Sequence, residues 1–415
     1  MKHPGNEAAP ILIAGGGIGG LAAALALLRR GIDVIVLEQA PQLREVGAGV
    51  QISPNGSRAL HDLGVLEAVR ASSCKTEGKE IRLWNTGQTW KPFDLGDQAV
   101  KRFGFPYFTA YRVDLHNALL DAVRELRPDA IRLNSRCVDF SQDEDGVTLT
   151  LADGSAVRGR ALVGADGIHS TVRTQAFGTE QARYADMIAW RGVIPMERVP
   201  ERLRRPVGTN WVGPGGHIIH YPLRRGELMN FVGYLEGKPW VAESWTTQAT
   251  VAECARDFAG WHEDVHALID SMDAPFKWGM VRRPRLDAWT VGRITLLGDA
   301  CHAMFPFLAQ GAVMALEDGV VLARCIEAEP GAVDAALARY ERLRRDRCYA
   351  VVDGSAQNVG RFHNRVLADP VEGPRYIERE WASQQVQARY DWIFDYDAAG
   401  VDLDEPAVAA GERHE

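Results

Sequence analysis

The chain has few cysteines, and their spacing gives no metal site. Six are scattered over 415 residues without a CxxC pair, at positions Cys74, Cys137, Cys254, Cys301, Cys325 and Cys348. Zinc sites and disulfide frameworks need paired or regularly spaced cysteines, so this pattern argues against both. Scattered cysteines are typical of reduced thiols, and we expect a cytoplasmic protein without a bound metal.

Long hydrophobic runs and an excess of basic residues are also absent. The one apolar candidate for a membrane or signal segment, residues 18–28, is too short to span a bilayer and begins among glycines. With 47 basic and 55 acidic residues, the net charge of −8 gives no electrostatic basis for nucleic-acid binding. Hydrophobic content of 46% and charged content of 25% are ordinary for a globular enzyme. We therefore expect neither a membrane protein nor a nucleic-acid partner.

A glycine cluster near the start of the chain lies between a short apolar run and a longer one. It reads GGGIGG, which predicts a strand, a tight turn and a helix in that order. Gly15 permits the turn, Gly17 lets the backbone approach a pyrophosphate, and Gly20 lets the helix and strand pack closely. The unpaired amides at the start of the helix favour a phosphate group.

A second apolar run ends in Glu38. At about this distance from the glycines, dinucleotide-binding units place an acid on the adenosine ribose. Strand, helix and acid together therefore predict a dinucleotide site.

A second glycine-rich segment, residues 298–312, reads GDACHAMFPFLAQGA and follows another apolar run. Asp299 comes at the carboxyl end of that run, where open α/β sheets bind ligands, and it could accept hydrogen bonds from a ribityl chain. Gly311 and Ala312 open a helix whose amides could hold the electron-rich edge of an isoalloxazine ring. An ordinary turn with a capping aspartate is the alternative. Together the two glycine-rich segments indicate a flavin.

A string with two histidines, His-Ile-Ile-His-Tyr at residues 217–221, lies in a region whose irregular apolar alternation predicts a mostly antiparallel sheet. Residues two apart on a strand share a face, so His217 and Tyr221 point one way and His220 points the other. A phenol with a pKa of about 10 needs a base to ionise at neutral pH, and histidine is suited to that task. We predict a catalytic role for His217 with Tyr221; a structural histidine is the alternative.

Three motifs in this order resemble the fingerprints of the class A flavoprotein monooxygenases, which are single-component, FAD-dependent aromatic hydroxylases. They are GGGIGG with Glu38, ALVGADG at residues 161–167 with Arg173 beyond it, and the 298–312 segment followed by Leu-Glu-Asp. The resemblance spans roughly residues 10–350. Within this family, the strings AWRG and LAQGA are most similar to those of salicylate, 3-hydroxybenzoate and 6-hydroxynicotinate hydroxylases.

The resemblance implies a monooxygenase that uses FAD, NADH or NADPH, and O2. Such an enzyme hydroxylates a small phenolic or hydroxypyridine carboxylic acid through a flavin C4a-hydroperoxide, with or without loss of the carboxyl group. Carried over residue by residue, it assigns FAD contacts to Gly15, Gly17, Gly20, Glu38, Arg44, Arg112, Asp166, Asp299, Gly311 and Ala312. Some relatives carry a polar side chain where this chain has Pro306 or Phe307, so a second proton-transfer group is left unassigned.

The predicted fold is α/β: a Rossmann-like FAD-binding lobe and a mixed, mostly antiparallel substrate sheet, similar to p-hydroxybenzoate hydroxylase. The FAD lobe is expected to be discontinuous and to contain residues 1–78, 105–183 and 285–365. The substrate lobe is expected from residues 79–104 and 184–284, a helical segment from 366–396 and a flexible acidic tail from 397–415. Aromatic residues in the helical segment suggest a homodimer.

Three alternatives stay open at this point. A nicotinamide-dependent dehydrogenase would use GGGIGG for NAD and would give residues 298–312 no role. A flavin-bound redox sensor would bind the cofactor without turnover. An enzyme of the same fold would hydroxylate a larger natural-product aromatic, and the sequence names neither the ring nor the position that is hydroxylated.

Overall fold

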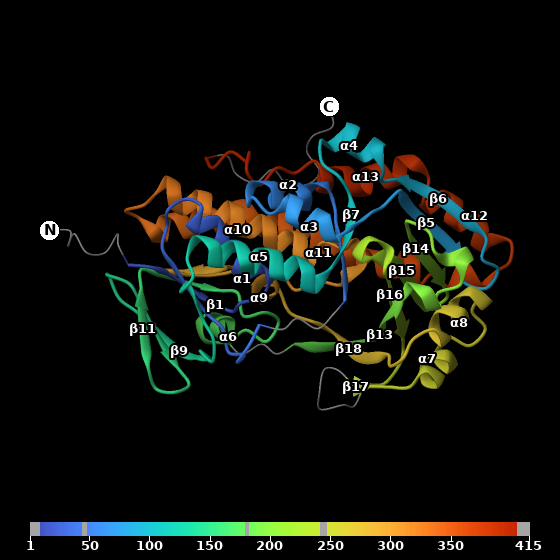
Figure 1. Ribbon diagram of the computed structural model, residues 1–415, viewed down its shortest axis with the longest axis horizontal. Helices are drawn as coiled ribbons and strands as arrows, with labels where there is room; N and C mark the ends of the chain where they lie inside the picture. The colour runs from blue at the N-terminus through green and yellow to red at the C-terminus, as the bar shows by residue number, and fades with distance from the viewer. Residues whose placement is uncertain (1–8, 44–47, 179–181, 241–246, 405–415) are drawn as a thin grey trace.

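The computed structural model describes residues 9–43, 48–178, 182–240 and 247–404, and two large sheets organise it (Figure 1). The first sheet has the order β19–β20–β12–β1–β2–β8, and its pairings are parallel except that of β19 with β20. Its strands are β1 (Ile11–Ala14), β2 (Val34–Leu37), β8 (Ile131–Arg132), β12 (Ala161–Gly164), β19 (Thr290–Val291) and β20 (Ile294–Leu296). Strand β1 is buried throughout, as expected for a central parallel strand covered on both faces.

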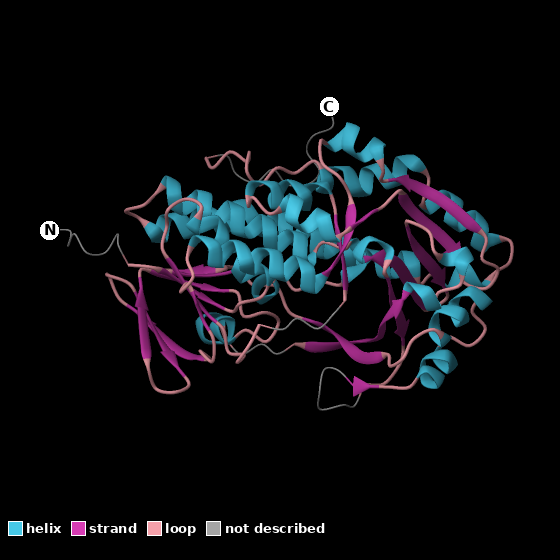
Figure 2. Cartoon of the chain, viewed as in Figure 1, coloured by secondary structure: helices cyan, strands magenta, loops and turns pink. Residues whose placement is uncertain are grey.

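Long helices form one layer beside this sheet (Figure 2). They are α1 (Ile18–Leu28), α5 (Arg112–Leu126), α10 (Gly311–Ala328) and α11 (Val333–Phe362). Helix α1 packs between α5 and α10. A Cβ on Gly319 would lie 2.8 Å from the Ala22 carbonyl carbon, so glycine at this position lets the backbones of α10 and α1 approach closely.

The second sheet has eight strands in the order β17–β18–β13–β16–β15–β14–β5–β6, and only the pairing of β14 with β5 is parallel among those described. Its strands are β5 (Gly78–Leu83), β6 (Thr89–Asp94), β13 (Arg183–Pro195), β14 (Val207–Gly213), β15 (Gly216–Leu223), β16 (Leu228–Glu236), β17 (Thr247–Gln248) and β18 (Phe276–Arg282). The predicted α/β class with a mostly antiparallel substrate sheet is confirmed.

One face of the eight-stranded sheet packs on α7 (Val251–Asp257) and α8 (Glu263–Asp270). Trp190, Trp211 and Phe258 are fully buried in this second core. The alternate residues of the same strands point to the opposite face, where they line a cavity.

Two three-stranded sheets complete the strands of the described chain. They contain β3 (Gly49–Ile52), β4 (Cys74–Lys75) and β7 (Phe108–Tyr111), and β9 (Cys137–Gln142), β10 (Val147–Leu151) and β11 (Ala156–Gly159). The sheet of β3, β7 and β4 is bonded to the eight-stranded sheet: the Gly49 amide donates to Asn230 Oδ1 at 2.9 Å, and Thr109 Oγ1 donates to the Pro222 carbonyl at 2.5 Å.

Helix α11 runs from the first sheet to the second. Near its start, Tyr340 donates to the Leu296 carbonyl at 3.2 Å, and it ends beside strand β15. Its buried Arg344 pairs with both Glu317 and Asp318 of α10, at 2.7 and 2.8 Å. Asp318 also lies 2.6 Å from the buried His302. These ion pairs fix α10, whose first turn borders the cavity, against α11.

The C-terminal segment folds back on its own chain. It contains helices α12 (Glu372–Glu380) and α13 (Ser383–Phe394), and its aromatic residues Trp381, Tyr390 and Phe394 are buried. The first residues of the predicted flexible tail are also packed, because Arg324 donates to the carbonyls of Ala398 and Val401.

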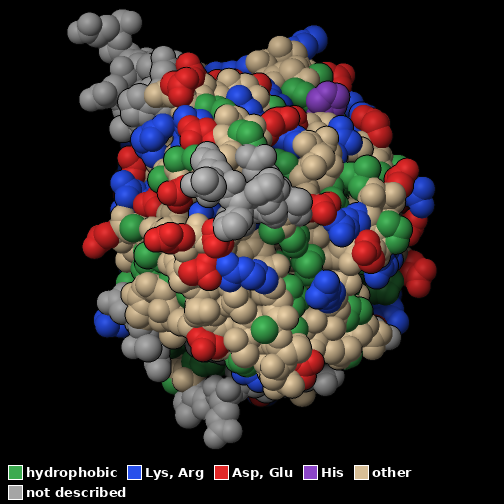
Figure 3. Space-filling model, turned by 90° about the vertical axis from the view of Figure 1, so that its left-hand side faces the viewer, with side chains coloured by type: hydrophobic (Ala, Val, Ile, Leu, Met, Phe, Trp, Pro, Cys, Tyr) green, Lys and Arg blue, Asp and Glu red, His purple; other side chains and the backbone are tan. Residues whose placement is uncertain are grey.

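The remaining helices are short. They are α2 (Pro54–Asp62), α3 (Leu66–Ser72), α4 (Asp97–Phe103), α6 (Thr171–Phe177) and α9 (Asp299–His302), with single 3-10 turns at Met196–Arg198, Glu201–Leu203, Arg224–Gly226, Pro306–Leu308 and Arg365–Ala368. Within the described ranges, no helix combines the length and apolar character needed to cross a membrane. On the face in Figure 3, acidic and basic side chains are interspersed.

Candidate active site

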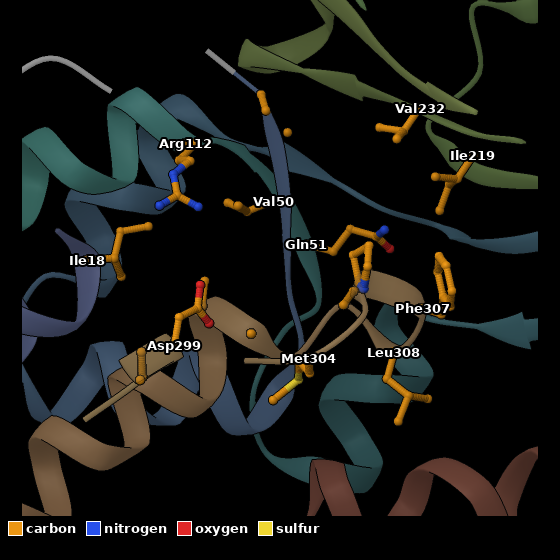
Figure 4. Close-up of a pocket in the computed structure, with 18 of the residues that line it drawn as sticks. Ile18, Val50, Gln51, Arg112, Ile219, Val232, Asp299, Met304, Phe307 and Leu308 are labelled. Carbon is orange, nitrogen blue, oxygen red and sulfur yellow. The ribbon is translucent and has the colours of Figure 1, made fainter. Parts of the chain in front are cut away.

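A cavity of ≈ 330 Å³ lies between the two large sheets and is lined by residues from both. Figure 4 shows Arg112 and Asp299 at one end and Ile219 and Phe307 at the other, with strand β3 passing between them. The first end is bordered by the GGGIGG loop and by the first turn of α10. We call it the nucleotide end, and the opposite end, against the eight-stranded sheet, the substrate end.

The predicted glycines of the nucleotide end occupy positions that a side chain would disturb in different ways. Gly15 has φ +107°, and a Cβ there would lie 2.5 Å from the Ala165 carbonyl oxygen. A Cβ on Gly20 would lie 2.0 Å from the Gly15 oxygen. At Gly17, which lines the cavity, a Cβ would meet no atom within 4 Å. The loop therefore packs closely on the backbone of Ala165 and on itself, and it leaves open space toward the cavity at Gly17.

Glu38 holds this loop from the end of β2. Its Oε2 accepts from the Gly16 amide at 2.7 Å, and its Oε1 accepts from the Ala40 amide at 2.8 Å. Helix α1 begins without a side-chain cap, so the amides of its first turn are available to a ligand. This arrangement suits the pyrophosphate and ribose of a dinucleotide.

Four further predicted residues line the same cavity. Arg112, the first residue of α5, and Asp299, the first residue of α9, face each other across its nucleotide end (Figure 4). Gly311 and Ala312 form the first turn of α10. The structure thus brings together the two glycine-rich segments that are far apart in the sequence. A dehydrogenase that gave residues 298–312 no role is not supported by this geometry.

Two predicted cofactor residues with described side chains, Glu38 and Asp166, are not among the residues that line the cavity. Arg44 lies outside the described residues. The Asp166 carboxylate caps α6 instead: it accepts from the Ser170 hydroxyl at 2.5 Å and from the Thr171 amide at 2.7 Å. Its neighbours Ala165 and Gly167 line the cavity with backbone.

The strand alternation predicted for residues 217–221 is present in β15. His217, Ile219 and Tyr221 line the cavity, whereas His220 is buried away from it. Neither ring nitrogen of His220 has a hydrogen-bond partner, and burial lowers its pKa to about 3. The two histidines of the string therefore lie in different environments, one at the cavity and one in the protein interior.

His217 lies in an aromatic enclosure at the substrate end. Its ring stacks on Tyr234 with centroids 4.6 Å apart, and Phe307 meets it edge-on at 4.8 Å. The side chain is 2% exposed, and burial, together with the nearby His363, holds its pKa well below the ordinary value. The imidazole is therefore neutral at pH 7 and has a nitrogen lone pair with which to accept a proton.

Tyr221 belongs to a group of phenols around Gln51. Tyr221 is hydrogen-bonded to Gln51, and Tyr107 donates to Gln51 Oε1 at 2.7 Å. Burial raises the pKa of Tyr221 above its ordinary value and that of Tyr234 to about 12. These phenols stay protonated at neutral pH and can act as hydrogen-bond donors to a ligand.

Two cationic side chains, one buried and one partly buried, line the substrate side of the cavity. Lys79 of β5 has its ammonium 5.0 Å from the centroid of the Tyr107 ring, and burial lowers its pKa to about 7. Arg191 of β13 has its guanidinium over Trp278, and its Nε has no hydrogen-bond partner. Asp299 is the only acid among the described residues that line the cavity. The cavity therefore carries a net positive charge that suits anionic ligands.

Sequence reasoning missed three groups at the substrate end. Tyr234 is in β16, where strand alternation with Val232 could have shown that it faces the cavity. Lys79 gave no signal, because a single lysine in a strand is normally solvent-exposed. His363 is 146 residues from His217, yet the two rings are hydrogen-bonded. No local pattern could have found that pair.

These features define a flavoprotein with a substrate site of its own. The two glycine-rich segments border the nucleotide end of the cavity, and the mostly antiparallel sheet lines its substrate end. The chain belongs to the FAD binding domain family, whose model matches residues 8–355. FAD as the cofactor is therefore confirmed, as is the predicted family resemblance.

Curated relatives cover nearly the whole chain. It is 36% identical over 403 residues to a 3-amino-4-hydroxybenzoate 2-monooxygenase from Streptomyces platensis, covering 97% of this chain and 99% of that protein. It is 37% identical over 390 residues to a 3-hydroxybenzoate 6-hydroxylase from Polaromonas naphthalenivorans, covering 93% and 95%. It is 33% identical over 410 residues to a 6-hydroxynicotinate 3-monooxygenase from Pseudomonas fluorescens, covering 98% and 99%.

Solved structures agree on the fold. A substrate complex of salicylate hydroxylase superposes with a TM-score of 0.79 at 24% identity, covering 94% of this chain and 96% of that one. Klebsiella pneumoniae HpxO with FAD and uric acid superposes with a TM-score of 0.78 at 26% identity, over the same shares. The protein is an FAD-dependent aromatic monooxygenase.

Proposed function

We propose that the protein uses NADH or NADPH and O2 to hydroxylate a small phenolic or hydroxypyridine carboxylic acid. The observation that carries this proposal is the substrate end of the cavity, which is lined by a neutral buried imidazole, His217, and by two cations, the buried Lys79 and the partly buried Arg191. The imidazole can accept the proton of a phenol, and the cations can pair with a carboxylate. The relatives named above act on acids of this kind.

The nucleotide end fits FAD. Gly17 and the open first turn of α1 would hold the pyrophosphate, Glu38 the ribose, and Asp299 the ribityl chain, while Gly311 and Ala312 would face the ring. Bound FAD supplies the redox chemistry that activates O2. The protein supplies position and excludes water from the enclosed cavity.

His217 would take the proton from the ring hydroxyl of the substrate. Its pKa is depressed, so it is unprotonated before substrate arrives, and the aromatic enclosure fixes the orientation of the ring. Removing the proton makes the substrate ring electron-rich, as electrophilic oxygen insertion requires. Tyr221 and Tyr234, both protonated, would donate hydrogen bonds to substrate oxygens.

Lys79 is the residue we propose for the substrate carboxylate. Its ammonium lies beside the rings of Tyr107 and Phe93 and forms no ion pair with a described residue, and a carboxylate would give it a charged partner. Arg191 of β13 also lines the cavity, but its guanidinium already stacks on Trp278.

We also propose a cytoplasmic location. All six cysteines are free thiols, and five of them are buried, as expected in a reducing compartment.

A substrate panel tests the activity. The FAD-loaded protein would be mixed with 3-hydroxybenzoate, 6-hydroxynicotinate, 3-amino-4-hydroxybenzoate and salicylate, and stimulated oxidation of NADH and of NADPH would be measured with product analysis. At least one acid should accelerate oxidation and yield a hydroxylated product. If none does, the small-acid substrate class is wrong, and larger aromatic scaffolds become the next compounds to assay.

A further inference from the structure

The base proposed for the reaction, His217, is one end of a hydrogen-bonded chain that leads away from the cavity. His217 Nδ1 lies 2.6 Å from His363 Nε2, and His363 Nδ1 lies 2.8 Å from Glu236 Oε1. Two imidazoles and a carboxylate are thus connected in series. None of the sequence motifs includes His363 or Glu236.

The backbone holds the members of this chain in place. His363 follows the last turn of α11, and its carbonyl accepts from the Gly215 amide at 3.0 Å. The Glu236 amide, at the end of β16, donates to the Gly215 carbonyl at 2.9 Å. One turn between β14 and β15 therefore fixes both residues beside His217, which comes two positions later.

Exposure to solvent increases along the chain. His217 is buried, and the side chains of His363 and Glu236 are 1% and 32% exposed. The hydrogen bond from His363 is the main cause that lowers the pKa of Glu236, so its carboxyl group is ionised at neutral pH. Arg365 adds a smaller contribution of the same sign.

The carboxylate decides which nitrogens carry protons. An ionised carboxylate only accepts hydrogen bonds, so Nδ1 of His363 carries a proton, and in the neutral ring Nε2 is the acceptor. His217 Nδ1 must then be the donor in the next bond, which leaves His217 Nε2 with its lone pair. This is the state that a base at the cavity needs.

We propose that His363 and Glu236 are positioning residues that carry the substrate proton from His217 to solvent. As the substrate O–H bond breaks, a bond from the proton to His217 Nε2 forms. The Nδ1 proton of His217 passes to His363 Nε2, and the Nδ1 proton of His363 passes to Glu236, which exchanges it with water. The reverse transfer returns a proton to the product oxygen and resets both rings. The inference rests on the proposed function of His217.

The chain from His217 through His363 to Glu236 provides the proton-transfer groups that the segment 298–312 lacks. Pro306 and Phe307 carry no proton-transfer group, and Phe307 instead packs edge-on against His217. The hydrogen-bonded chain to Glu236 begins on the other side of the same imidazole, at the end of α11. The titratable and charged groups around the pair are Glu236, Arg365 and Tyr234.

The test follows proton transfer directly in the FAD-loaded, oxidised enzyme. The probe is 4-hydroxy-3-nitrobenzoate, a phenolic acid whose ring absorbs differently as phenol and as phenolate, mixed by stopped flow at a pH where it is free phenol. The wild type should ionise it on binding and release a proton to a pH indicator. His363→Gln, whose amide can accept from His217 but not pass a proton on, and Glu236→Gln should each slow both signals at least tenfold with unchanged affinity.

Two controls separate transfer from structure. Glu227→Gln, which changes an exposed carboxylate just before β16, should leave the rate unchanged. In His363→Gly, imidazole added to the buffer should restore the rate. Three results would overturn proton transfer through His363 and Glu236: equal rates in all variants, an equal loss of rate in Glu227→Gln, or no rescue by imidazole. None of these results would affect the activity measured on the substrate panel. A wild type that neither binds the probe nor turns over any panel acid would instead overturn the proposed function.

Discussion

At the nucleotide end of the cavity the glycine loop presents main chain, whereas the substrate end is lined by side chains from several strands. Gly15, Gly17 and Gly20 lie within six residues of one another, and each acts through the absence of a side chain. Lys79, Arg191, His217 and Tyr234 come from strands β5, β13, β15 and β16, and His363 from the end of α11.

The difference has a physical origin. A pyrophosphate is bound by amides and a helix dipole, which every sequence possesses, so that end is specified by removing side chains at fixed short spacing. An aromatic ring with two polar substituents is bound by particular functional groups at particular distances. Those groups can come from any strand of the sheet, since only their position on its inner face matters.

The largest effect should come from Gly20→Ala at the nucleotide end. Its Cβ would lie 2.0 Å from the Gly15 carbonyl oxygen, so the turn and helix α1 must separate. We expect a loss of about 3 kcal/mol in the free energy of unfolding, the upper part of the usual range for overpacking, and no bound FAD. Thermal unfolding and the flavin absorbance of the purified protein would measure both.

Gly17→Ala is the matched control for that change. Its methyl group would meet no atom of the protein but would occupy the cavity side of the loop. The apoprotein should unfold at the wild-type temperature and bind FAD more weakly. If both variants lose the same stability, the assignment of packing to Gly20 and ligand approach to Gly17 is wrong.

The second effect is on chemistry at the substrate end. His217→Gln should lower the rate of hydroxylation by about 10²-fold or more, the contribution typical of a general base, while the flavin content stays normal. The comparison would be made at saturating acid and NADH, with product quantified as well as NADH consumed. A variant that hydroxylates at the wild-type rate would remove His217 from the mechanism.

A smaller effect should appear in substrate affinity. Lys79→Met should raise KM for the acid by about 10-fold or more, the value of a charge-assisted hydrogen bond, with kcat less affected. The pKa of Lys79 is lowered to about 7, so the ammonium is present below that pH and is lost above it. In the wild type KM should therefore rise as the pH increases beyond 7.

In Lys79→Met that dependence should disappear, and Lys79→Arg should retain a low KM across the range. A KM that rises with pH equally in the wild type and in Lys79→Met would assign the carboxylate to another residue.

The contrast between the two ends of the cavity explains which parts of the fold and of the site could be predicted from the sequence. The α/β class, the FAD site and the shared face of His217 and Tyr221 follow from local spacing: three glycines in six residues, an acid at the end of a strand, and the two-residue period of β15. Local spacing does not report what a strand packs against. Lys79 is buried with the rings of Tyr107 and Phe93 beside its ammonium, and His363 reaches His217 because α11 ends beside β15.

The smallest effect should come from His220→Leu, on the opposite face of the strand that carries His217. His220 is buried without a hydrogen-bond partner for either ring nitrogen, and its pKa of about 3 keeps it uncharged. It therefore acts as a space-filling group, and a swap that roughly conserves volume should change the free energy of unfolding by less than about 1.5 kcal/mol. Hydroxylation and KM should match the wild type. The two histidines are three residues apart on opposite faces of β15. A large loss of activity in His220→Leu would therefore contradict the assignment of catalysis to the face that lines the cavity and of packing to the other face.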